Sequence, residues 1–340
     1  LAPDTTYYFK VKITAEPDLA YSQVLPATAT WVAAPGGIYS LSSYFTADSS
    51  FTAGANIGWS TNGNPEWTSY DLQYSTDPAF TPSSVLLKGY PPVVMGGLYA
   101  NTTYYFKVRA RGLSGTLTAY TPSISTATMA LKLSGLSDTV YETSSTVSWT
   151  AVNGAAQAEK SAGYSLYVYN DPALSVLFSS WTTATPAASS AGISGLTRNT
   201  TYYYRAGALN LPGAPNLTVP RSFTTLSAVP QNLARLSVAD YTASLGWTAL
   251  PAGTAMGYRL EASTTNFAAG GVPESSVSYR TDLSTLTLTT LDPNTTYYFR
   301  VGSVNSAFAA NYGNSVASVT LALPVSADLA AVSATVREVT

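Results

Sequence analysis

The sequence predicts an all-β protein made of tandem β-sandwiches in an elongated array. Short segments alternate apolar and polar residues with a period of two and are rich in Tyr, Val, Thr and Trp, which is typical of strands with one buried face. Turn-forming residues separate these segments, and no long stretch shows helical periodicity. One strand-like segment recurs four times at nearly constant spacing, so the chain contains repeated structural units.

The clearest repeated segment begins Thr-Thr-Tyr-Tyr. Its first tyrosine recurs at intervals of 97, 98 and 95 positions, at Tyr7, Tyr104, Tyr202 and Tyr297. The copies occupy residues 5–11, 102–108, 200–206 and 295–301. Because side chains alternate across a strand, we expect residues 104, 106, 108 and 110 to face a core and residues 105, 107 and 109 to face solvent.

Two further markers keep step with this repeat. An apolar residue lies two positions before a tryptophan, and a tyrosine-led alternating run follows. The tryptophans are Trp59, Trp149 and Trp247, and the tyrosine-led runs cover residues 70–74, 164–168 and 258–262. Turn-forming pairs such as Asp77-Pro78 lie between the segments. Many short strands in a unit of about 95 residues indicate a β-sandwich.

These residues give the chain a resemblance to tandem fibronectin type III domains, which are immunoglobulin-like β-sandwiches. The matching features are the inward tryptophan of the second strand, the tyrosine-led third strand and the approach to the sixth strand, whose clearest copy is Leu291-Asp292-Pro293-Asn294-Thr295-Thr296-Tyr297. Ala100 and Arg198 replace the proline in two other copies. The resemblance implies that the four repeated tyrosines are tyrosine-corner residues, whose hydroxyls bond back to the preceding loop. The run at residues 75–80 is similar to a loop common in bacterial members of this family.

Proline and short apolar links mark most of the predicted domain boundaries. Residues 1–33 are predicted to be the C-terminal strands of a truncated fibronectin type III domain. Complete domains are predicted at residues 34–129, 130–227 and 228–322, and the first strand of a further domain at residues 323–340. Links of only a few residues favour a semi-rigid rod over loosely joined beads.

The two terminal pieces have two interpretations. In the first, the sequence is a window on a longer array of domains. In the second, the terminal strand of one subunit completes the exposed sheet of the next by β-strand addition, since an unpaired sheet edge would otherwise invite aggregation. The first interpretation is favoured.

The composition excludes several classes of chemistry. The chain has neither histidine nor cysteine, which excludes a Ser-His-Asp triad, a His-ligated zinc site, a disulfide and a thiolate nucleophile. The formal net charge of −2 argues against a nucleic-acid binder, and no apolar run reaches the roughly 18 residues of a membrane span. The carboxylates are scattered, and calcium-loop and phosphate-loop motifs are missing. We therefore expect neither an enzyme nor a cofactor or metal site.

Four Asn-X-Thr sequons are candidate N-glycosylation sites in a secretory pathway. They begin at Asn101, Asn199, Asn216 and Asn294. Three of them overlap the repeated Thr-Thr-Tyr-Tyr segment, where asparagine tolerates a turn and threonine suits the start of a strand. For Asn101, Asn199 and Asn294 this structural interpretation is favoured over glycosylation.

Two sets of aromatic residues are candidates for an interaction surface. The outward tyrosines Tyr8, Tyr105, Tyr203 and Tyr298 each recur close to a lysine or arginine. They are interpreted either as a lateral stripe that contacts other molecules or, preferably, as ordinary cross-strand pairing on a solvated sheet. Trp67 lies in a loop and is a candidate platform for a sugar ring or a partner. Packing of Trp67 against its own loop or the next domain is the favoured alternative.

Near-identical repeats, short links and low charge predict a structural protein, extracellular or on the cell surface, that forms a rod, stalk or filament. Its expected partners are copies of itself or neighbouring modules of the same chain, since many weak identical contacts gain strength through avidity. The alternative function is an adhesin or a carbohydrate-binding spacer segment of a larger secreted protein, with cell-surface glycans as partners.

Overall fold

The computed structural model describes residues 1–16, 20–45, 52–268 and 273–324. Within these residues all regular structure is β-strand except for one 3-10 turn at Gln157–Glu159, which confirms the predicted all-β class. The chain groups into two compact units. The first comprises residues 1–137, 148–191 and 203–221, and the second comprises residues 138–147, 192–202 and those from 222 onward.

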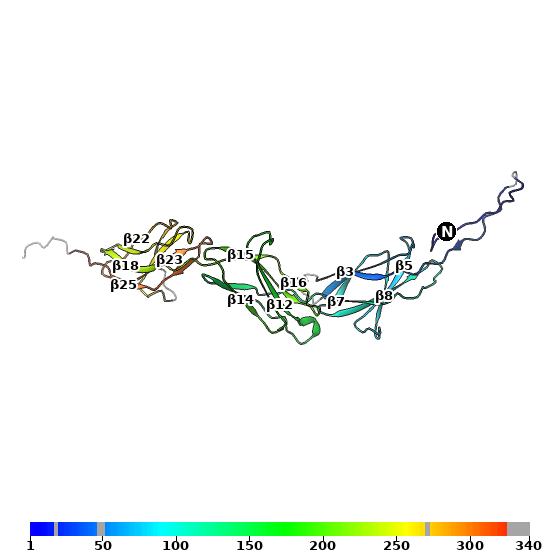
Figure 1. Cartoon of the computed structure of the whole chain (residues 1–340), viewed down its shortest axis with the longest axis horizontal. Helices are drawn as coiled ribbons and strands as arrows, with labels where there is room; N and C mark the ends of the chain where they lie inside the picture. Colours follow the sequence, from blue (N-terminus) through cyan, green and yellow to red (C-terminus); the bar gives the residue numbers. More distant parts are fainter. Residues whose placement is uncertain (17–19, 46–51, 269–272, 325–340) are drawn as a thin grey trace, which may run out of the picture. The chain divides into compact units, whose positions relative to one another are not determined.

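The first repeat has two antiparallel sheets around a shared core (Figure 1). In spatial order, the three-stranded sheet is β3 (Ile38–Phe45), β4 (Thr52–Trp59) and β7 (Val93–Tyr99), and the four-stranded sheet is β6 (Ser84–Lys88), β5 (Ser69–Ser75), β8 (Thr103–Arg111) and β9 (Ile124–Ala127). Ile57 and Leu98 of the first sheet join Leu72 and Phe106 of the second in one buried cluster. Burial alternates along β8 as the sequence pattern predicts.

The second repeat contains a three-stranded and a five-stranded sheet. The three-stranded sheet is β10 (Ser137–Val140), β11 (Ser144–Ser148) and β14 (Ser190–Ser194). The five-stranded sheet is β13 (Leu177–Thr183), β12 (Gly163–Tyr169), β15 (Thr201–Leu209) and β16 (Pro215–Leu217), with β17 (Arg221–Thr224) also paired to β15. The strand arrangement of the first repeat thus recurs here.

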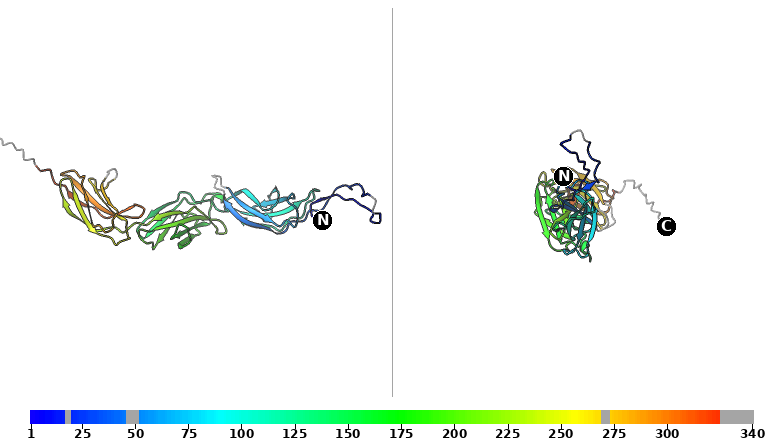
Figure 2. Two further views of the ribbon diagram at one scale, coloured as in Figure 1. Left: turned by 90° about the horizontal axis from the view of Figure 1, so that it is seen from above. Right: turned by 90° about the vertical axis from the view of Figure 1, so that its right-hand side faces the viewer.

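The third repeat has the same two-sheet plan, and its yellow and orange strands form two layers in Figure 2. The three-stranded sheet is β18 (Gln231–Val238), β19 (Ala243–Thr248) and β22 (Thr285–Leu288). The other sheet is β21 (Glu274–Ser278), β20 (Gly257–Ser263), β23 (Thr296–Val304) and β24 (Ala310–Tyr312), with β25 (Val316–Val319) paired to β23. Leu245 and Leu288 meet Leu260 and Phe299 across the core.

The predicted inward tryptophan is buried in all three repeats. In each repeat it packs against the tyrosine that leads the third strand. The ring centroids of Trp59–Tyr70, Trp149–Tyr164 and Trp247–Tyr258 lie 5.2, 5.3 and 5.0 Å apart. Tilted aromatic pairs at this distance add stability to a core beyond that gained from burying their apolar surface. The same Trp–Tyr pair lies in the core of each repeat.

The four repeated tyrosines form the corner that the family resemblance implies. Each hydroxyl accepts a hydrogen bond from a backbone N–H five residues earlier. The donors are Ala2, Tyr99, Thr197 and Asp292, at 2.8, 3.0, 3.0 and 3.0 Å. The expected tyrosine corner is therefore confirmed in every copy.

A threonine closes the same corner in each copy. These residues are Thr30, Thr128, Thr225 and Thr320. Each hydroxyl accepts an N–H from the first threonine of the repeated segment and donates to a corner carbonyl. For Thr225 the hydroxyl lies 2.9 Å from the Thr200 nitrogen and 2.6 Å from the Thr197 oxygen. The start of the repeated segment and the end of the same repeat are thereby joined at one point.

The described part of residues 1–33 forms a hairpin, drawn dark blue in Figure 2. β1 (Thr6–Tyr7) pairs antiparallel with β2 (Thr28–Ala29), and further out the Leu25 N–H donates to the Phe9 carbonyl at 2.9 Å. The boundaries proposed at residues 34, 130, 228 and 323 stay predictions. Most of the further strand predicted at 323–340 lies outside the described residues.

Candidate interface at the joints between repeats

An aspartate or asparagine precedes every copy of the repeated Thr-Thr-Tyr-Tyr segment. These residues are Asp4, Asn101, Asn199 and Asn294, with φ of 47, 46, 49 and 49°. This is the left-handed region, which Asn and Asp tolerate better than other residues with a Cβ. We call these four residues the joint residues.

Three joint residues bind the next repeat through the same atom. The Oδ1 atom of Asp4 accepts the Leu113 backbone N–H, that of Asn101 accepts the Leu211 N–H, and that of Asn199 accepts the Ser306 N–H. All three N···O distances are 2.7 Å. Partners are 107 to 110 positions apart in sequence, so each bond joins one copy of the segment to the repeat that follows it.

The donating N–H groups lie in equivalent turns, which we call the donor turns: residues 112–116, 210–214 and 305–309. Each turn is closed by a backbone hydrogen bond from its first residue to its fifth. These bonds run from Gly112 to Thr116, from Asn210 to Ala214 and from Asn305 to Ala309, at 2.9, 3.0 and 2.9 Å. The turn shape presents the N–H of its second residue to the joint residue in all three cases.

Further bonds hold the first two joint residues. The Asp4 carbonyl accepts the Trp67 Nε1–H at 3.1 Å, and the Asn101 carbonyl accepts Gln157 Nε2–H at 3.0 Å. Asn101 Nδ2 also donates to the Lys160 carbonyl at 3.1 Å. Asp4 and Asn101 are each only 1% exposed. At such burial an unpaired amide or carboxylate would be costly, and these joints leave the two side chains paired.

The donor turns and the following strands bond back to the links between repeats. Asn305 Nδ2 donates to the Thr225 carbonyl at 3.0 Å, and Asn210 Nδ2 donates to the Thr128 carbonyl at 3.3 Å. Asn216 and Asn311 occupy equivalent strand positions and donate to the link carbonyls of Ala130 and Ser227, both at 2.7 Å. Each link is therefore tied to the repeat that it precedes.

In the first donor turn Gly112 takes the place of the turn asparagine. A Cβ at Gly112 would lie 3.1 Å from the Val32 side chain and 3.3 Å from Asp4 Oδ1. The hairpin of residues 1–33 thus packs close to this turn, and a glycine fits the space.

The structure places the four predicted glycosylation sites in different surroundings. Asn101 is buried, and Asn216 is 8% exposed with its Nδ2 bonded to Ala130. Asn199 is half-buried and Asn294 is exposed. A glycan on Asn101 or Asn216 would have to be attached to a buried amide nitrogen that already donates a hydrogen bond. Glycosylation stays a prediction, and Asn294 is the most accessible of the four sites.

Sequence reasoning missed the joint contacts, although one signal was present. The first copy of the segment has Asp4 where the others have asparagine. Aspartate cannot carry an N-glycan, but it shares with asparagine the Oδ1 acceptor and the tolerance of a left-handed backbone. A role common to all four residues must therefore rest on these shared properties.

Trp67 lies at the first joint. Its side chain is 62% exposed, yet its indole N–H is committed to Asp4. Asp4 belongs to the preceding hairpin rather than to the loop of Trp67 or the next domain, so packing against that loop or domain stays a prediction, as does the role of the exposed ring as a binding platform.

The outward tyrosines differ in exposure. Tyr8 is 71% exposed, and Tyr105, Tyr203 and Tyr298 are half-buried. Two of the neighbouring cations contact other rings of their own repeat: Lys107 Nζ lies 4.0 Å from the Phe80 centroid, and the Arg300 guanidinium lies 3.8 Å from the Phe267 centroid and 3.9 Å from that of Tyr312. Part of the surface of these two cations is thus already covered. A stripe that contacts other molecules stays a prediction.

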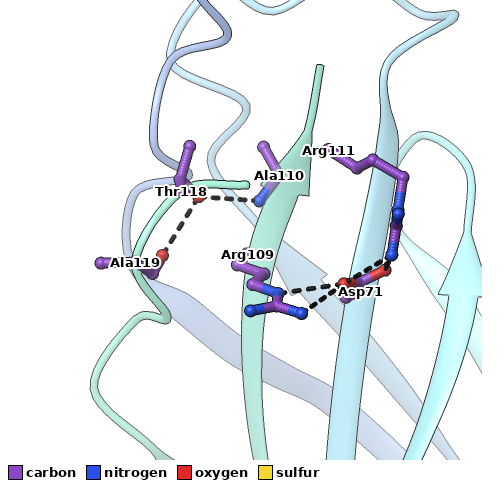
Figure 3. A network of polar contacts seen from close by, with 6 residues as sticks. All are labelled: Asp71, Arg109, Ala110, Arg111, Thr118 and Ala119. Atoms are coloured by element: carbon purple, nitrogen blue, oxygen red, sulfur yellow. Dashed lines mark hydrogen bonds and ion pairs between the residues drawn. The ribbon is translucent and has the colours of Figure 1, made fainter. Parts of the chain in front are cut away.

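Two buried carboxylates are paired with arginine on the sheet faces. Asp71 receives Arg109 at 2.9 Å and Arg111 at 3.0 Å (Figure 3), and Glu261 receives Arg300 at 2.7 Å. Nearby, the Thr118 hydroxyl accepts the Ala110 N–H and donates to the Ala119 carbonyl, also drawn in Figure 3. Among the residues that the structure describes, no cluster of three acidic, histidine or cysteine side chains suits a metal ion. Over the same ranges no helix is long and apolar enough to cross a membrane.

The third repeat should lose stability in alkaline solution through Tyr312. Burial of the ring, together with O–H donation to Glu261 Oε1 at 2.5 Å, raises the pKa of Tyr312 to about 12. An unfolded tyrosine loses its proton near pH 10, so between about pH 10 and 12 unfolding releases a proton and stability falls as pH rises. We expect Tyr312→Phe to flatten this slope in guanidinium unfolding curves. Exposed Tyr241 supplies the control, Tyr241→Phe, and an unchanged slope in Tyr312→Phe would contradict this assignment.

Comparison with known proteins gives a family match in the third repeat. Residues 228–318 match the model of the fibronectin type III domain. The chain is also 29% identical to Endoglucanase B of Cellulomonas fimi over 195 aligned residues, which cover 52% of this chain and 17% of the endoglucanase. The chain therefore spans less than a fifth of the length of this curated relative.

Solved structures of tandem fibronectin type III domains are also similar. The crystal structure of the chicken CNTN1 FN1–FN3 domains is 16% identical, with a TM-score of 0.33, and the match covers 84% of this chain and 98% of that one. The two-domain segment of chicken tenascin is 16% identical, with a TM-score of 0.30, and the match covers 56% and 99% of the two chains. Residues 228–318 therefore form a fibronectin type III domain, and the tryptophan pair and tyrosine corner of that domain recur in the first and second repeats, which are tandem β-sandwiches of the same plan.

Proposed function

We propose that the chain is a non-catalytic, extracellular structural segment whose tandem modules form a rod, stalk or surface filament. The observation that supports this role is a hydrogen bond that recurs at three successive joints. In each, the Oδ1 atom of the joint residue accepts a donor-turn N–H at an N···O distance of 2.7 Å. Neighbouring domains normally move relative to one another unless their interface is extensive. A short link with several hydrogen bonds to the next module restricts that motion, as a spacer requires.

The proposal is tested by breaking one joint at a time. Asn199→Gly removes the acceptor that holds Ser306 but keeps the left-handed backbone unstrained. Loss of one such bond weakens docking by about 1 kcal/mol, which raises the undocked population about fivefold. We expect a broader distribution of distances between spin labels at Ser180 and Ser275, two exposed positions in the second and third repeats.

The natural chain has no cysteine, so label pairs can be placed without other changes. A second pair at Ser84 and Ser180 spans the preceding joint and serves as an internal control, because Asn199→Gly should leave it unchanged. Asn101→Gly should give the reverse pattern, and Asn199→Asp, which keeps the acceptor, should resemble the parent. Equal distance distributions in the parent and both glycine variants would contradict restriction by these joints.

The second candidate function is an adhesin or carbohydrate-binding spacer in a larger secreted protein. It is favoured by the partial match to Endoglucanase B, of which this chain covers 17%, and by the exposed ring of Trp67. If this function holds, polysaccharide binding in a pull-down assay should fall in Trp67→Ala and survive in Trp67→Phe, because phenylalanine keeps a ring that can stack on a sugar. Equal binding by both variants would remove Trp67 from this role.

A further inference from the structure

The fourth joint residue, Asn294, has the same local structure as the other three. Its φ is 49°, and its backbone N–H donates to the Leu321 carbonyl at 3.0 Å. Asn101 makes the equivalent bond to Met129 at 2.9 Å. The Thr320 hydroxyl closes the corner beside Asn294, accepting from the Thr295 N–H at 2.9 Å and donating to the Asp292 carbonyl at 2.6 Å. The accepting half of a joint is therefore already formed at this end of the third repeat.

This fourth joint lacks a partner within the described part of the chain. The Asn294 side chain is exposed and makes no hydrogen bond there, whereas Asp4 and Asn101 are buried by their donor turns. Preorganisation of the accepting group lowers the entropy cost of docking. Asn294 thus has the same local geometry as the three joint residues that bind a donor turn, but no donor turn is bound to it among the described residues.

The link residue two positions after the corner threonine gives a second, independent observation. At the three occupied joints this residue is buried: Val32, Ala130 and Ser227. At the fourth position Ala322 is exposed, and its neighbours Leu321 and Leu323 are 59% and 52% exposed. The link residue is thus buried at the three occupied joints and exposed at the fourth. The exposed link lies beside Asn294, whose side-chain oxygen has no partner among the described residues.

We propose that Asn294 receives the donor turn of a further fibronectin type III module that follows residue 322 in the same polypeptide; this inference rests on the proposed spacer function. Asn294 would recognise a main-chain N–H in a turn of the same kind, closed by a backbone hydrogen bond between its first and fifth residues. The sequence supports a module in this position, because the link Leu321-Ala322-Leu323-Pro324 parallels Leu226-Ser227-Ala228-Val229-Pro230. The donor turns of the three described repeats are engaged by Asp4, Asn101 and Asn199, which favours a module in the same chain over a second copy.

The test uses the full chain with residues 228–322 duplicated directly after Ala322. This insertion places a second copy of Ser306 where the proposed donor N–H should lie. We expect the amide of the copied Ser306 to exchange its hydrogen about fivefold faster in Asn294→Gly than in the duplicated parent, from the loss of one hydrogen bond. Asn294→Asp should exchange like the parent, because Asp4 performs the same role at the first joint.

The original Ser306 in the same molecule separates this inference from the proposed function. If Asn199→Gly speeds exchange at the original Ser306 but Asn294→Gly leaves the copied residue unchanged, the inference about Asn294 is overturned and the spacer proposal stands. If neither substitution changes its partner amide, the joints do not restrict motion and both proposals fail. In the unduplicated chain, dimers that are lost in Asn294→Gly would overturn the assignment to the same polypeptide, because the donor turn would then come from another copy.

Discussion

Replacing Gly163 with alanine is expected to unfold the second repeat. A Cβ at this position would lie 1.9 Å from the Thr183 carbonyl oxygen and 2.8 Å from the Ala184 Cα, and φ is +142°. Both obstacles are backbone atoms, one in the last residue of the paired strand β13 and one in the residue that follows it, so no flexible side chain can give way. The backbone conformation is also one that residues with a Cβ rarely adopt. Together these effects should cost about 4 kcal/mol or more.

Hydrogen exchange followed by mass spectrometry locates this effect along the chain. Peptides from residues 137–224 should lose protection in Gly163→Ala, while peptides from the first repeat keep theirs. Gly192→Ala is the matched control, because the added Cβ meets no atom within 4 Å, and its stability should lie within about 0.5 kcal/mol of the parent. Native protection of β12 and β13 in Gly163→Ala would show that the strand pair can separate at little cost.

Thr225→Val should destabilise the corner of the second repeat by about 2 kcal/mol, because it leaves two partly buried backbone groups unpaired. Thr225 is fully buried, and its hydroxyl accepts from the Thr200 N–H and donates to the Thr197 carbonyl. Valine has nearly the same shape, so the loss reports the hydroxyl rather than the packing. The Thr225 carbonyl also accepts from Asn305, so damage to the corner should loosen the following joint as well.

Guanidinium unfolding measures the first effect, and exchange at the Ser306 amide measures the second. Thr225→Ser keeps the hydroxyl and loses only a methyl group, so it should cost about 1 kcal/mol and leave the joint intact. If the valine and serine variants were equally stable, the hydroxyl bonds would not be what closes the corner.

The fold could be predicted because its signals are local in sequence. Trp59 and Tyr70 are separated by one short loop, and each lies in a run whose alternation reveals its buried face. The tyrosine corner joins residues five positions apart, and the Thr-Thr-Tyr-Tyr segment marks it four times. Repetition reinforces each weak local signal, so strand positions and inward residues can be predicted from the sequence.

The joints could not be predicted in the same way. The bond from Leu211 to Asn101 spans 110 positions, and its donor is a backbone N–H, which leaves no trace in residue type. Asn101 was recognised as a turn former, and its left-handed φ agrees with that interpretation. Its sequon points to the amide nitrogen, whereas the atom common to the three occupied joints is the side-chain oxygen. The pairing of Lys107 with Phe80 was likewise hidden, because it depends on where a loop folds over the sheet.

The donor turns also bear on how such a chain changes in evolution. The residues that supply the N–H are leucine, leucine and serine, so the joints place no demand on the side chain at this position. A gene segment that encodes one module can be duplicated, deleted or recombined with another, and the new neighbours still carry the acceptor and the amide that connect them. Length can then change in steps of one module while the acceptor and the amide are kept at each new junction, which makes the number of modules an easily varied trait.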